Sequence, residues 1–314
     1  MRSRTTTRRV AGLWLGTLVD IAAEGDSADT VEHAIAAAFA EIASVHHSMS
    51  AHACDSELVR VNRLATHASQ RVSGGFHAVL ACALDVAAQS HGAFDPTIGG
   101  LLCELGFVPG HGGHGPATWR DVHLDQHGVR FERPLQLDFG GIAKGYAVDR
   151  AIAALRERGI LRACVNAGGD LRVFGQRSEV VHVRTGGSAG VALPLVCIAD
   201  GAVATSGYAS QRRRVGARWA TPLIDARRGL PRMSTRTVSV VAPGCMLADA
   251  LTKVVALLGA DATGVLEHYH ASATILTPAN GRWRCTEVPR GGVHASRVRA
   301  PRIPAHHARN PAPV

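Results

Sequence analysis

Aromatic residues and long apolar runs are both scarce in this chain of 314 residues. Phe, Trp and Tyr make up only 4% of the sequence, which argues against a stacking platform for single-stranded nucleic acid. No apolar run approaches the ~18–20 residues that cross a bilayer, so we expect no stable membrane insertion. Hydrophobic residues nevertheless reach 46%, a content that supplies a sizeable core and excludes wholesale disorder.

The net charge of +9 is concentrated at the two ends of the chain. Residues 1–9 contain four arginines and no acid, and residues 282–314 contain seven arginines and one acid. The segment between them has 23 basic and 24 acidic residues. It therefore presents no general positive field to a polyanion, and we expect no nucleic-acid partner. The Pro-, Arg- and His-rich composition of residues 289–314 predicts a disordered tail.

Cysteine pairs of the C-x-x-C type are absent. The seven cysteines lie scattered in apolar stretches, which predicts buried free thiols in a reducing compartment. Arg8 and Arg9 precede a short apolar run, as in a twin-arginine signal, but Asp20 and Glu24 interrupt that run. No small-residue cleavage site or lipid-carrying cysteine follows. We therefore expect the first strand of a domain here, and a cytoplasmic protein.

Hydrophobic periodicity predicts helices and short strands in an irregular order. Because the two kinds of element do not alternate regularly, an α+β fold with mixed or antiparallel sheets is favoured over a doubly wound sheet. We expect one domain over residues 10–288. The predicted helices cover residues 30–45, 55–64, 76–90, 145–158 and 247–258. The predicted strands cover residues 13–21, 122–124, 129–131, 162–166, 171–174, 180–184, 195–199, 218–224, 237–242 and 272–276.

A glycine-rich turn links a predicted strand, Leu135–Leu137, to the helix that begins near Gly145. Backbone N–H groups and the positive end of a helix dipole can bind an anion at such a turn, and Lys144 adds a charge. The glycine spacing and the Lys-Ser/Thr pair of a Walker motif are missing. An ordinary tight turn with a solvated lysine is the alternative.

Three residues near the start of the last predicted helix share one face, because Asp249, Thr252 and Lys253 are spaced i, i+3 and i+4. Asp249 is either a helix N-cap or a carboxylate that holds a hard cation together with Thr252. The turn at Gly92–Gly99 fits ligand binding and simple chain reversal about equally well. The paired glycines of Asn166–Asp170 allow close approach of a ligand, but taken alone they favour an ordinary hairpin.

The order and spacing of these motifs resemble the FAD:protein FMN transferases of the ApbE family. The resemblance extends from Leu15 to Leu276, so it covers most of the chain. It rests on Leu15–Thr17, Met49–Asn62, Gly92–Gly99, Leu137–Asp149, Val165–Asp170, Ala204–Tyr208, Leu223–Pro231 and Ala248–Leu251.

The resemblance implies a two-lobed fold that binds FAD in the cleft between its lobes. Such an enzyme splits the FAD pyrophosphate with Mg²⁺, attaches FMN through a phosphoester bond to a threonine of an acceptor flavoprotein, and releases AMP. The acceptor carries a motif of the Asp-Gly-x-(Ser/Thr)-Gly-(Ala)-Thr kind.

Roles are carried over from the family by matching positions. The implied FAD-binding residues are Leu15, His52, Ala93, Phe94, Asp95, Asp138, Lys144 and Ile224. The implied metal ligands are Gly141, Asp249 and Thr252, and the implied catalytic residues are Asp249 and Lys253.

The chain departs from the family pattern at two chemically important positions. Lys253 replaces a metal-binding threonine, and an ammonium cannot coordinate Mg²⁺. Either Thr252 supplies the hydroxyl instead or Lys253 replaces part of the metal's charge; of the two, we favour retained Mg²⁺ with altered ligation. Thr221-Pro222 stands where the family has a histidine implicated in catalysis, which leaves Asp249 or Asp170 as the general base.

Two smaller departures concern the flavin. His52 stands where the family often has a tyrosine that stacks on the flavin, and Leu15 stands where it often has a methionine. An active transferase is the main prediction. A non-catalytic flavin-binding protein and an FAD pyrophosphatase remain as alternatives.

Overall fold

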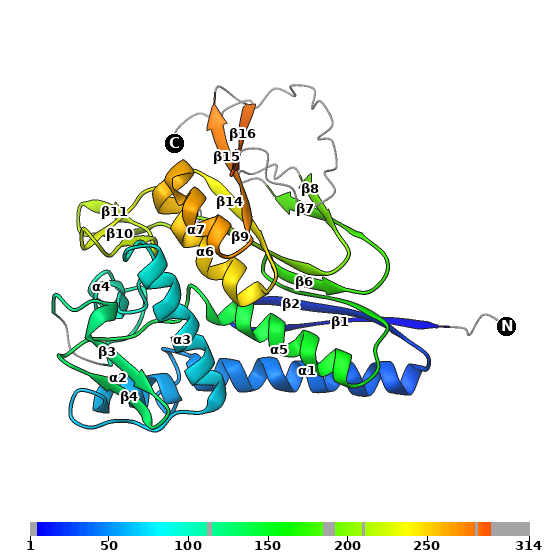
Figure 1. Ribbon diagram of the computed structural model, residues 1–314, viewed down its shortest axis with the longest axis horizontal. Coiled ribbons are helices and arrows are strands. Elements are labelled where there is room, and N and C mark those ends of the chain that lie inside the picture. Colours follow the sequence, from blue (N-terminus) through cyan, green and yellow to red (C-terminus); the bar gives the residue numbers. More distant parts are fainter. Residues whose placement is uncertain (1–4, 112–114, 185–191, 209–210, 280–281, 290–314) are drawn as a thin grey trace.

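The computed structural model describes residues 5–111, 115–184, 192–208, 211–279 and 282–289. Its largest element is an eight-stranded sheet in the order β1-β2-β5-β6-β9-β14-β15-β16 (Figure 1). Every neighbouring pair in this sheet is antiparallel. The predicted α+β class is therefore confirmed. The predicted tail, apart from residue 289, lies outside the described residues.

The strands of this sheet use segments from both ends of the chain. They are β1 (Thr6–Trp14), β2 (Thr17–Gly25), β5 (Arg162–Ala167), β6 (Asp170–Phe174), β9 (Gly201–Gly207), β14 (Thr237–Ala242), β15 (Ser272–Ala279) and β16 (Arg282–Val288).

Four two-stranded hairpins complete the β structure. They are β3 (Val122–Asp125) with β4 (Gly128–Phe131), β7 (Glu179–Arg184) with β8 (Ala192–Ile198), β10 (Arg213–Val215) with β11 (Arg218–Ala220), and β12 (Ile224–Asp225) with β13 (Leu230–Pro231). The helices are α1 (Ala28–Met49), α2 (Glu57–Leu64), α3 (Gly74–Gln89), α4 (Gly99–Glu104), α5 (Ala143–Glu157), α6 (Cys245–Leu258) and α7 (Thr263–His268), with short 3₁₀ helices η1 (Trp119–Asp121) and η2 (Gly259–Ala262).

The first strand differs from the sequence prediction. A continuous strand over 13–21 is wrong, because Leu15 and Gly16 form a tight turn with φ of 55° and 71°. Trp14 pairs with Thr17 across this turn. Two residues with positive φ give the twist that a two-residue hairpin requires. Leu15 is therefore a turn residue that packs at the border of the core.

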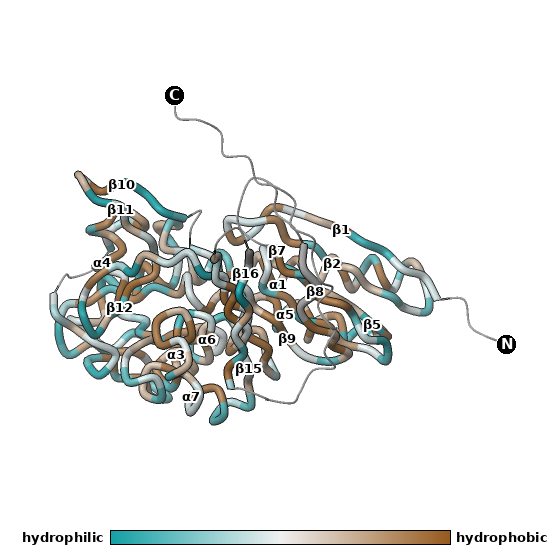
Figure 2. Tube along the Cα trace, turned by 90° about the horizontal axis from the view of Figure 1, so that it is seen from above, coloured by the Kyte–Doolittle hydropathy of each residue, from teal (hydrophilic) through white to brown (hydrophobic). Residues whose placement is uncertain are grey.

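Helices cover one face of the main sheet. Helix α1 begins at the cap Ser27, whose hydroxyl accepts a hydrogen bond from Thr30 N at 3.1 Å. Its buried residues recur every three or four positions, so they form one apolar stripe: Val31, Ala34, Ile35, Ala38, Ile42, Val45 and Met49. Helix α5 packs between α1 and α6, and all three helices contact strands of the sheet. Figure 2 shows apolar residues gathered along α5, α6 and β9.

The hairpin β7–β8 covers part of the opposite face. Val181 and Val196 of this hairpin are buried against Leu171, Val173 and Val203 of strands β6 and β9. The central strands β6 and β9 are thus buried on both faces. Packing on both faces holds β6 and β9 in place, and the turns of the site lie at the ends of these two strands.

The segment between α1 and α5 forms a separate layer beside the sheet. It contains α2, α3, α4 and the β3–β4 hairpin, which lie on one side of α6 in Figure 1. The predicted hairpin over 122–131 is confirmed, with Asp125 paired to Gly128 across its turn. The predicted strand over 218–224 is instead two short strands, β11 and β12.

Two further expectations concern the burial of the cysteines and the presence of membrane-spanning helices. Of the seven cysteines, Cys245 is buried, whereas Cys54 and Cys285 are exposed, so the expectation of uniformly buried thiols is wrong. Within the described ranges, no helix combines the length and apolar character needed to cross a membrane.

Candidate active site

Segments that are far apart in the sequence meet around one cavity of about 320 Å³. Phe94, Phe107 and Leu223 contribute to an apolar wall, while Lys144 and Lys253 contribute cationic side chains. A pocket of this size with a few convergent polar groups is typical of small-molecule sites. Eight of the predicted site residues line it: Ala93, Phe94, Asp95, Asp138, Gly141, Lys144, Ile224 and Lys253.

Four predicted residues do not line this cavity. Asp249 and Thr252 are completely buried on α6, directly behind the lining. The alternative of Asp249 as an N-cap is wrong, because α6 begins at Cys245 and its N-cap is Gly244. Leu15 lies in the β1–β2 turn, and His52 is exposed after α1. The flavin contacts of Leu15 and His52 remain predictions.

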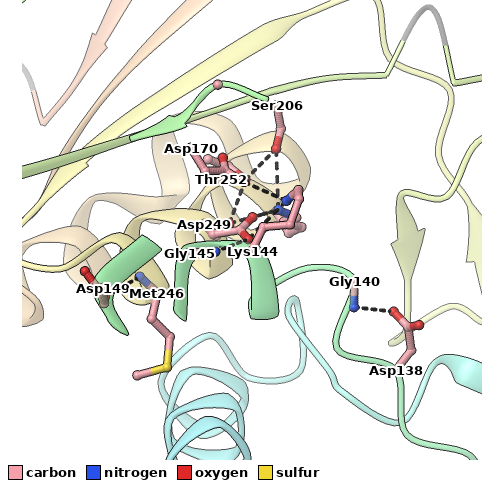
Figure 3. Close-up of polar contacts among 12 residues, drawn as sticks. Asp138, Gly140, Lys144, Gly145, Asp149, Asp170, Ser206, Met246, Asp249 and Thr252 are labelled. Atoms are coloured by element: carbon pink, nitrogen blue, oxygen red, sulfur yellow. Dashed lines mark hydrogen bonds and ion pairs between the residues drawn. The ribbon is translucent and has the colours of Figure 1, made fainter. Parts of the chain in front are cut away.

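The carboxylate of Asp249 contacts two lysines, Lys144 (Figure 3) and Lys253. Its Oδ2 accepts hydrogen bonds from Lys144 Nζ and from the backbone N–H of Gly145, both at 3.2 Å. Its Oδ1 accepts a hydrogen bond from Lys253 Nζ. Helices α5 and α6 pack together and place these groups in contact. Asp249 is therefore a buried anchor for two ammonium groups that border the cavity.

A second carboxylate completes the ionic cluster. Asp170 begins β6, is buried, and lies 2.6 Å from Lys144 Nζ. The glycine pair before it adopts φ of 64° at Gly168 and 104° at Gly169, a left-handed conformation that glycine adopts with little strain. This turn brings Asp170 to the cavity from the sheet side, opposite the helices.

Three oxygen atoms contact the Lys253 ammonium, the first of them in the Asp249 carboxylate. Lys253 Nζ lies 3.0 Å from the backbone oxygen of Asp249 and 3.5 Å from Ser206 Oγ. Thr252 Oγ1 donates to the same Asp249 backbone oxygen at 2.7 Å and lies 2.8 Å from Ser206 Oγ. Lys253 therefore has an entirely oxygen-lined environment, and Thr252 is engaged within the helix.

The charges fix the protonation of this cluster. Burial alone would lower the pKa of Lys144, but Asp170 and Asp249 outweigh it and raise that pKa. Burial opposes ionisation of Asp249, yet Lys144 and Lys253 lower its pKa below the ordinary 3.8. Burial and the charge of Asp249 raise the pKa of Asp170. Of the two carboxyl groups, Asp170 is thus the better proton acceptor.

The side chains of Asp249 and Thr252, both predicted to bind Mg²⁺, are engaged with other partners and do not fit a metal ion as they are arranged. Both carboxylate oxygens of Asp249 already accept hydrogen bonds from nitrogen donors. The Thr252 hydroxyl is buried and donates to a backbone oxygen. Among the described residues, no group of three or more His, Cys, Asp or Glu side chains could hold a metal. An ammonium is located where the predicted ligands would need a cation.

The predicted flavin-contacting turn is held by Asp95. Its Oδ1 accepts hydrogen bonds from Thr97 N at 2.8 Å and Thr97 Oγ1 at 2.7 Å. Its Oδ2 accepts a hydrogen bond from the backbone N–H of Trp119 at 3.2 Å. Burial raises the Asp95 pKa, although these hydrogen bonds oppose the shift. Asp95 therefore braces the turn that presents Phe94 to the cavity.

The glycine-rich loop before α5 forms another side of the cavity. Asp138 Oδ1 accepts a hydrogen bond from Gly140 N at 2.9 Å, and burial raises the Asp138 pKa. A Cβ at Gly141 would lie 3.3 Å from the Phe94 ring and 3.4 Å from Lys253 Cε. Glycine at 141 thus permits the close approach of an aromatic and a cationic side chain. Helix α5 begins at Ala143, so Lys144 lies in its first turn rather than before it.

The segment 205–208 is a part of the cavity wall to which the sequence predictions give no role. Thr205, Ser206 and Tyr208 all line the cavity. Tyr208 is 4% exposed, and its hydroxyl forms no hydrogen bond of ordinary geometry with a described residue. The signal in the sequence was a run of hydroxyl side chains following apolar residues in one short segment. An unpartnered buried hydroxyl at a cavity wall is a candidate ligand contact.

Comparisons with known proteins show which family the chain resembles. A model of the ApbE family matches residues 15–276. A Rhodobacter capsulatus protein named FAD:protein FMN transferase is 30% identical over 266 residues, which cover 78% of this chain and 50% of that protein. A Treponema pallidum protein of the same name is 30% identical over 294 residues, which cover 82% of this chain and 80% of that protein.

Solved structures show the same fold. The flavin transferase ApbE from Vibrio cholerae superposes with a TM-score of 0.75 at 22% identity, covering 91% of this chain and 98% of that chain. The chain belongs to the ApbE family, because the family model matches most of its length. The predicted family is therefore confirmed, and with it the enzyme class of flavin transferases. The chain spans half the length of the Rhodobacter relative.

Proposed function

We propose that the chain binds FAD in this cavity, splits its pyrophosphate and transfers FMN to a threonine of an acceptor protein. The observation that carries the proposal is the ionic cluster of Lys144, Lys253, Asp170 and Asp249 beside an apolar wall. Lysines bind phosphate as point charges, and the apolar wall suits a flavin ring. We place FAD between the layer of 93–98 and the sheet-side residues of 168–170 and 205–208, as the cleft between two lobes.

The positioning of FAD follows from the cavity lining. Phe94, Leu223 and Ile224 would contact the flavin ring, and Gly140 and Gly141 leave room for a phosphate close to the backbone. Lys144 and Lys253 are each anchored on Asp249, so they face the pyrophosphate without reorganising. Such fixed charges stabilise a transition state more than mobile ones do.

The transfer itself requires a nucleophile, a base and a leaving group. The acceptor threonine oxygen attacks the phosphorus on the FMN side, forming one P–O bond while the P–O bond to AMP breaks. Asp170 accepts the hydroxyl proton, because its raised pKa makes it a better base than Asp249. AMP departs with the bridging oxygen, and the lysines neutralise the charge that develops there.

The segment at the family's histidine position cannot replace that base. Thr221 is completely buried, and its hydroxyl donates to the backbone oxygen of Arg232 at 2.8 Å. Pro222 lines the cavity but carries no proton-accepting group. The proton therefore goes to the sheet-side carboxylate, Asp170, rather than to this loop.

A flavinylation assay tests the proposal. The purified chain and FAD are mixed with a small acceptor domain that carries the threonine motif, both with millimolar Mg²⁺ and with EDTA. We expect flavin fluorescence to stay with the acceptor on a denaturing gel, and to vanish when the acceptor threonine is changed to alanine. AMP should appear in equal amount by chromatography.

Other outcomes separate the alternatives. Release of AMP and free FMN, with a dark acceptor across a panel of motifs, indicates an FAD pyrophosphatase. FAD binding without AMP under either condition indicates a non-catalytic flavin-binding protein. The cytoplasmic location remains a prediction, which cell fractionation tests.

A further inference from the structure

The lysines of this chain are both in the site. Of 34 Lys and Arg residues, only Lys144 and Lys253 are lysines, and the remaining 32 are arginines. Both lysines contact the carboxylate of one buried residue, Asp249. A lysine carries a compact point charge, whereas an arginine carries a planar fork. The site thus contains ammonium groups in a chain that otherwise uses guanidinium groups.

The surroundings of Lys253 are those of a bound cation. Its Nζ contacts three oxygen atoms: the Asp249 carboxylate, the Asp249 backbone oxygen and Ser206 Oγ. Its side chain lies against Gly141, where a Cβ would come within 3.4 Å of Cε. The side chain is 18% exposed and lines the cavity. The ammonium is therefore coordinated on one side and open to a ligand on the other.

Two ammonium groups already lie at the Asp249 carboxylate, where a divalent cation would have to bind. The two ammonium groups and the carboxylates of Asp170 and Asp249 sum to zero. A cation placed against Asp249 would lie within a few ångströms of both lysines, and like charges at that range disfavour one another strongly. A pyrophosphate carries two negative charges, and Lys144 and Lys253 are the two cationic side chains among the described residues that line the cavity.

We propose that the Lys253 ammonium is a built-in cation at the pyrophosphate site, so that FAD binding and cleavage in this chain need no divalent metal. The proposal rests on the proposed function and departs from the Mg²⁺ ligation that the sequence predicts. Thr252 cannot supply that ligation in this arrangement, since its hydroxyl is fully buried and donates to a backbone oxygen.

The first test measures metal and FAD binding directly. Mn²⁺ is used as the probe, because its paramagnetic resonance signal falls when it binds. With FAD present, the wild-type chain should leave the Mn²⁺ signal unchanged, and EDTA should alter FAD affinity by less than about threefold. Lys253→Thr should weaken FAD binding in EDTA by about a hundredfold, and should bind Mn²⁺ together with FAD.

Lys253→Arg is the matched control, since it keeps the positive charge and replaces the compact ammonium group with a planar guanidinium group. It should gain no Mn²⁺ site, even where FAD affinity falls. The urea midpoint of each variant at neutral pH shows whether it is folded. The proposal is overturned if the wild-type chain binds Mn²⁺ in the presence of FAD and loses FAD in EDTA. It is also overturned if folded Lys253→Thr neither loses FAD affinity nor gains a metal site.

The second test separates this proposal from the transferase function. AMP release and acceptor labelling are measured with millimolar Mg²⁺ and with EDTA. Labelling that requires Mg²⁺ overturns the built-in cation and supports the transferase. Labelling with Mg²⁺ and also with EDTA supports both the built-in cation and the transferase function. Absence of labelling and of AMP in either condition contradicts the transferase, while the Mn²⁺ and FAD binding data still decide the role of Lys253.

Discussion

The carboxylate of Asp149 lies 2.9 Å from the backbone N–H of Cys245, so helix α5 supplies the N-terminal cap of helix α6. Met246 N donates to the same carboxylate, also at 2.9 Å. The N-cap position of α6 is Gly244, which has no side chain for this task. Arg172 on β6 holds Asp149 from the sheet side at 2.7 Å. This contact sets the register of the two helices whose lysines meet at Asp249.

Removal of this cap should weaken the site from a distance. Asp149→Ala leaves two N–H groups of α6 without acceptors, and we expect it to lower the free energy of unfolding by about 2 kcal/mol. Urea titration measures the loss. Asp200→Ala is the control, because it removes an exposed ion pair with Arg156 that should contribute less than about 1 kcal/mol. Equal effects of the two changes would contradict the capping role.

Helix contact at Gly145 should tolerate no side chain. A Cβ there would lie 2.2 Å from the backbone oxygen of Cys245, so Gly145→Ala must push α5 away from α6. We expect a loss of about 2–3 kcal/mol and weaker FAD binding, measured by urea titration and flavin fluorescence. Gly264→Ala meets nothing within 4 Å and should be neutral or slightly stabilising. A fully stable Gly145→Ala chain would show that the helices can separate without cost.

The ion pair of Asp249 with Lys253 should give a defined pH dependence. Because the Asp249 pKa is lowered below 3.8, the pair stabilises the fold above that pH and loses its effect as the pH falls through the folded pKa. At pH 7, Lys253→Met should be about 2 kcal/mol less stable than the wild type. The difference should be constant from about pH 7 to 5 and shrink below 3.8. A difference that widens on acidification contradicts the assignment.

The hydroxyl of Tyr208 should contribute more to FAD binding than to the stability of the fold. It is buried at the cavity and forms no hydrogen bond of ordinary geometry with a described residue, so Tyr208→Phe removes at most a weak contact with Ser206. We expect the free energy of unfolding to change by less than about 0.5 kcal/mol and FAD to bind about tenfold more weakly. Fluorescence quenching of FAD measures the affinity. An unchanged affinity with a large loss of stability would indicate a purely structural hydroxyl.

Local patterns predicted the regular elements well. The apolar periodicity of residues 30–45 located α1, and the short β runs at 122–124 and 129–131 located the two strands of the β3–β4 hairpin. The turn at Leu15-Gly16 was missed, because leucine is rarely found at positive φ. The strand β16 was also missed, because its sequence is polar, although it pairs with β15 directly before it in the chain. The central strand β9 was missed too, and its partners β6 and β14 lie far from it in the sequence.

The site shows the same limit of local reasoning. The i, i+4 spacing placed Asp249 and Lys253 together on one helix face, and their ion pair is present. The contact of Lys144 with Asp249 spans 105 positions along the chain, and no local pattern encodes it. The order of the family motifs brought the two segments into one hypothesis. Leu15 and His52 were included on the same ground, and they lie outside the cavity lining.

The insertion between β2 and β5 has a consequence for how the chain reaches its native state. Residues 26–161 must be looped out before these adjacent strands can pair, and this loop supplies the 93–144 side of the cavity. Long-range pairing of this kind slows folding, because chain entropy is lost before contacts form. Lys144 reaches Asp249 only after α6, near the far end of the chain, has docked. Affinity for FAD should therefore appear in the last phase of refolding, after most of the helical signal has recovered.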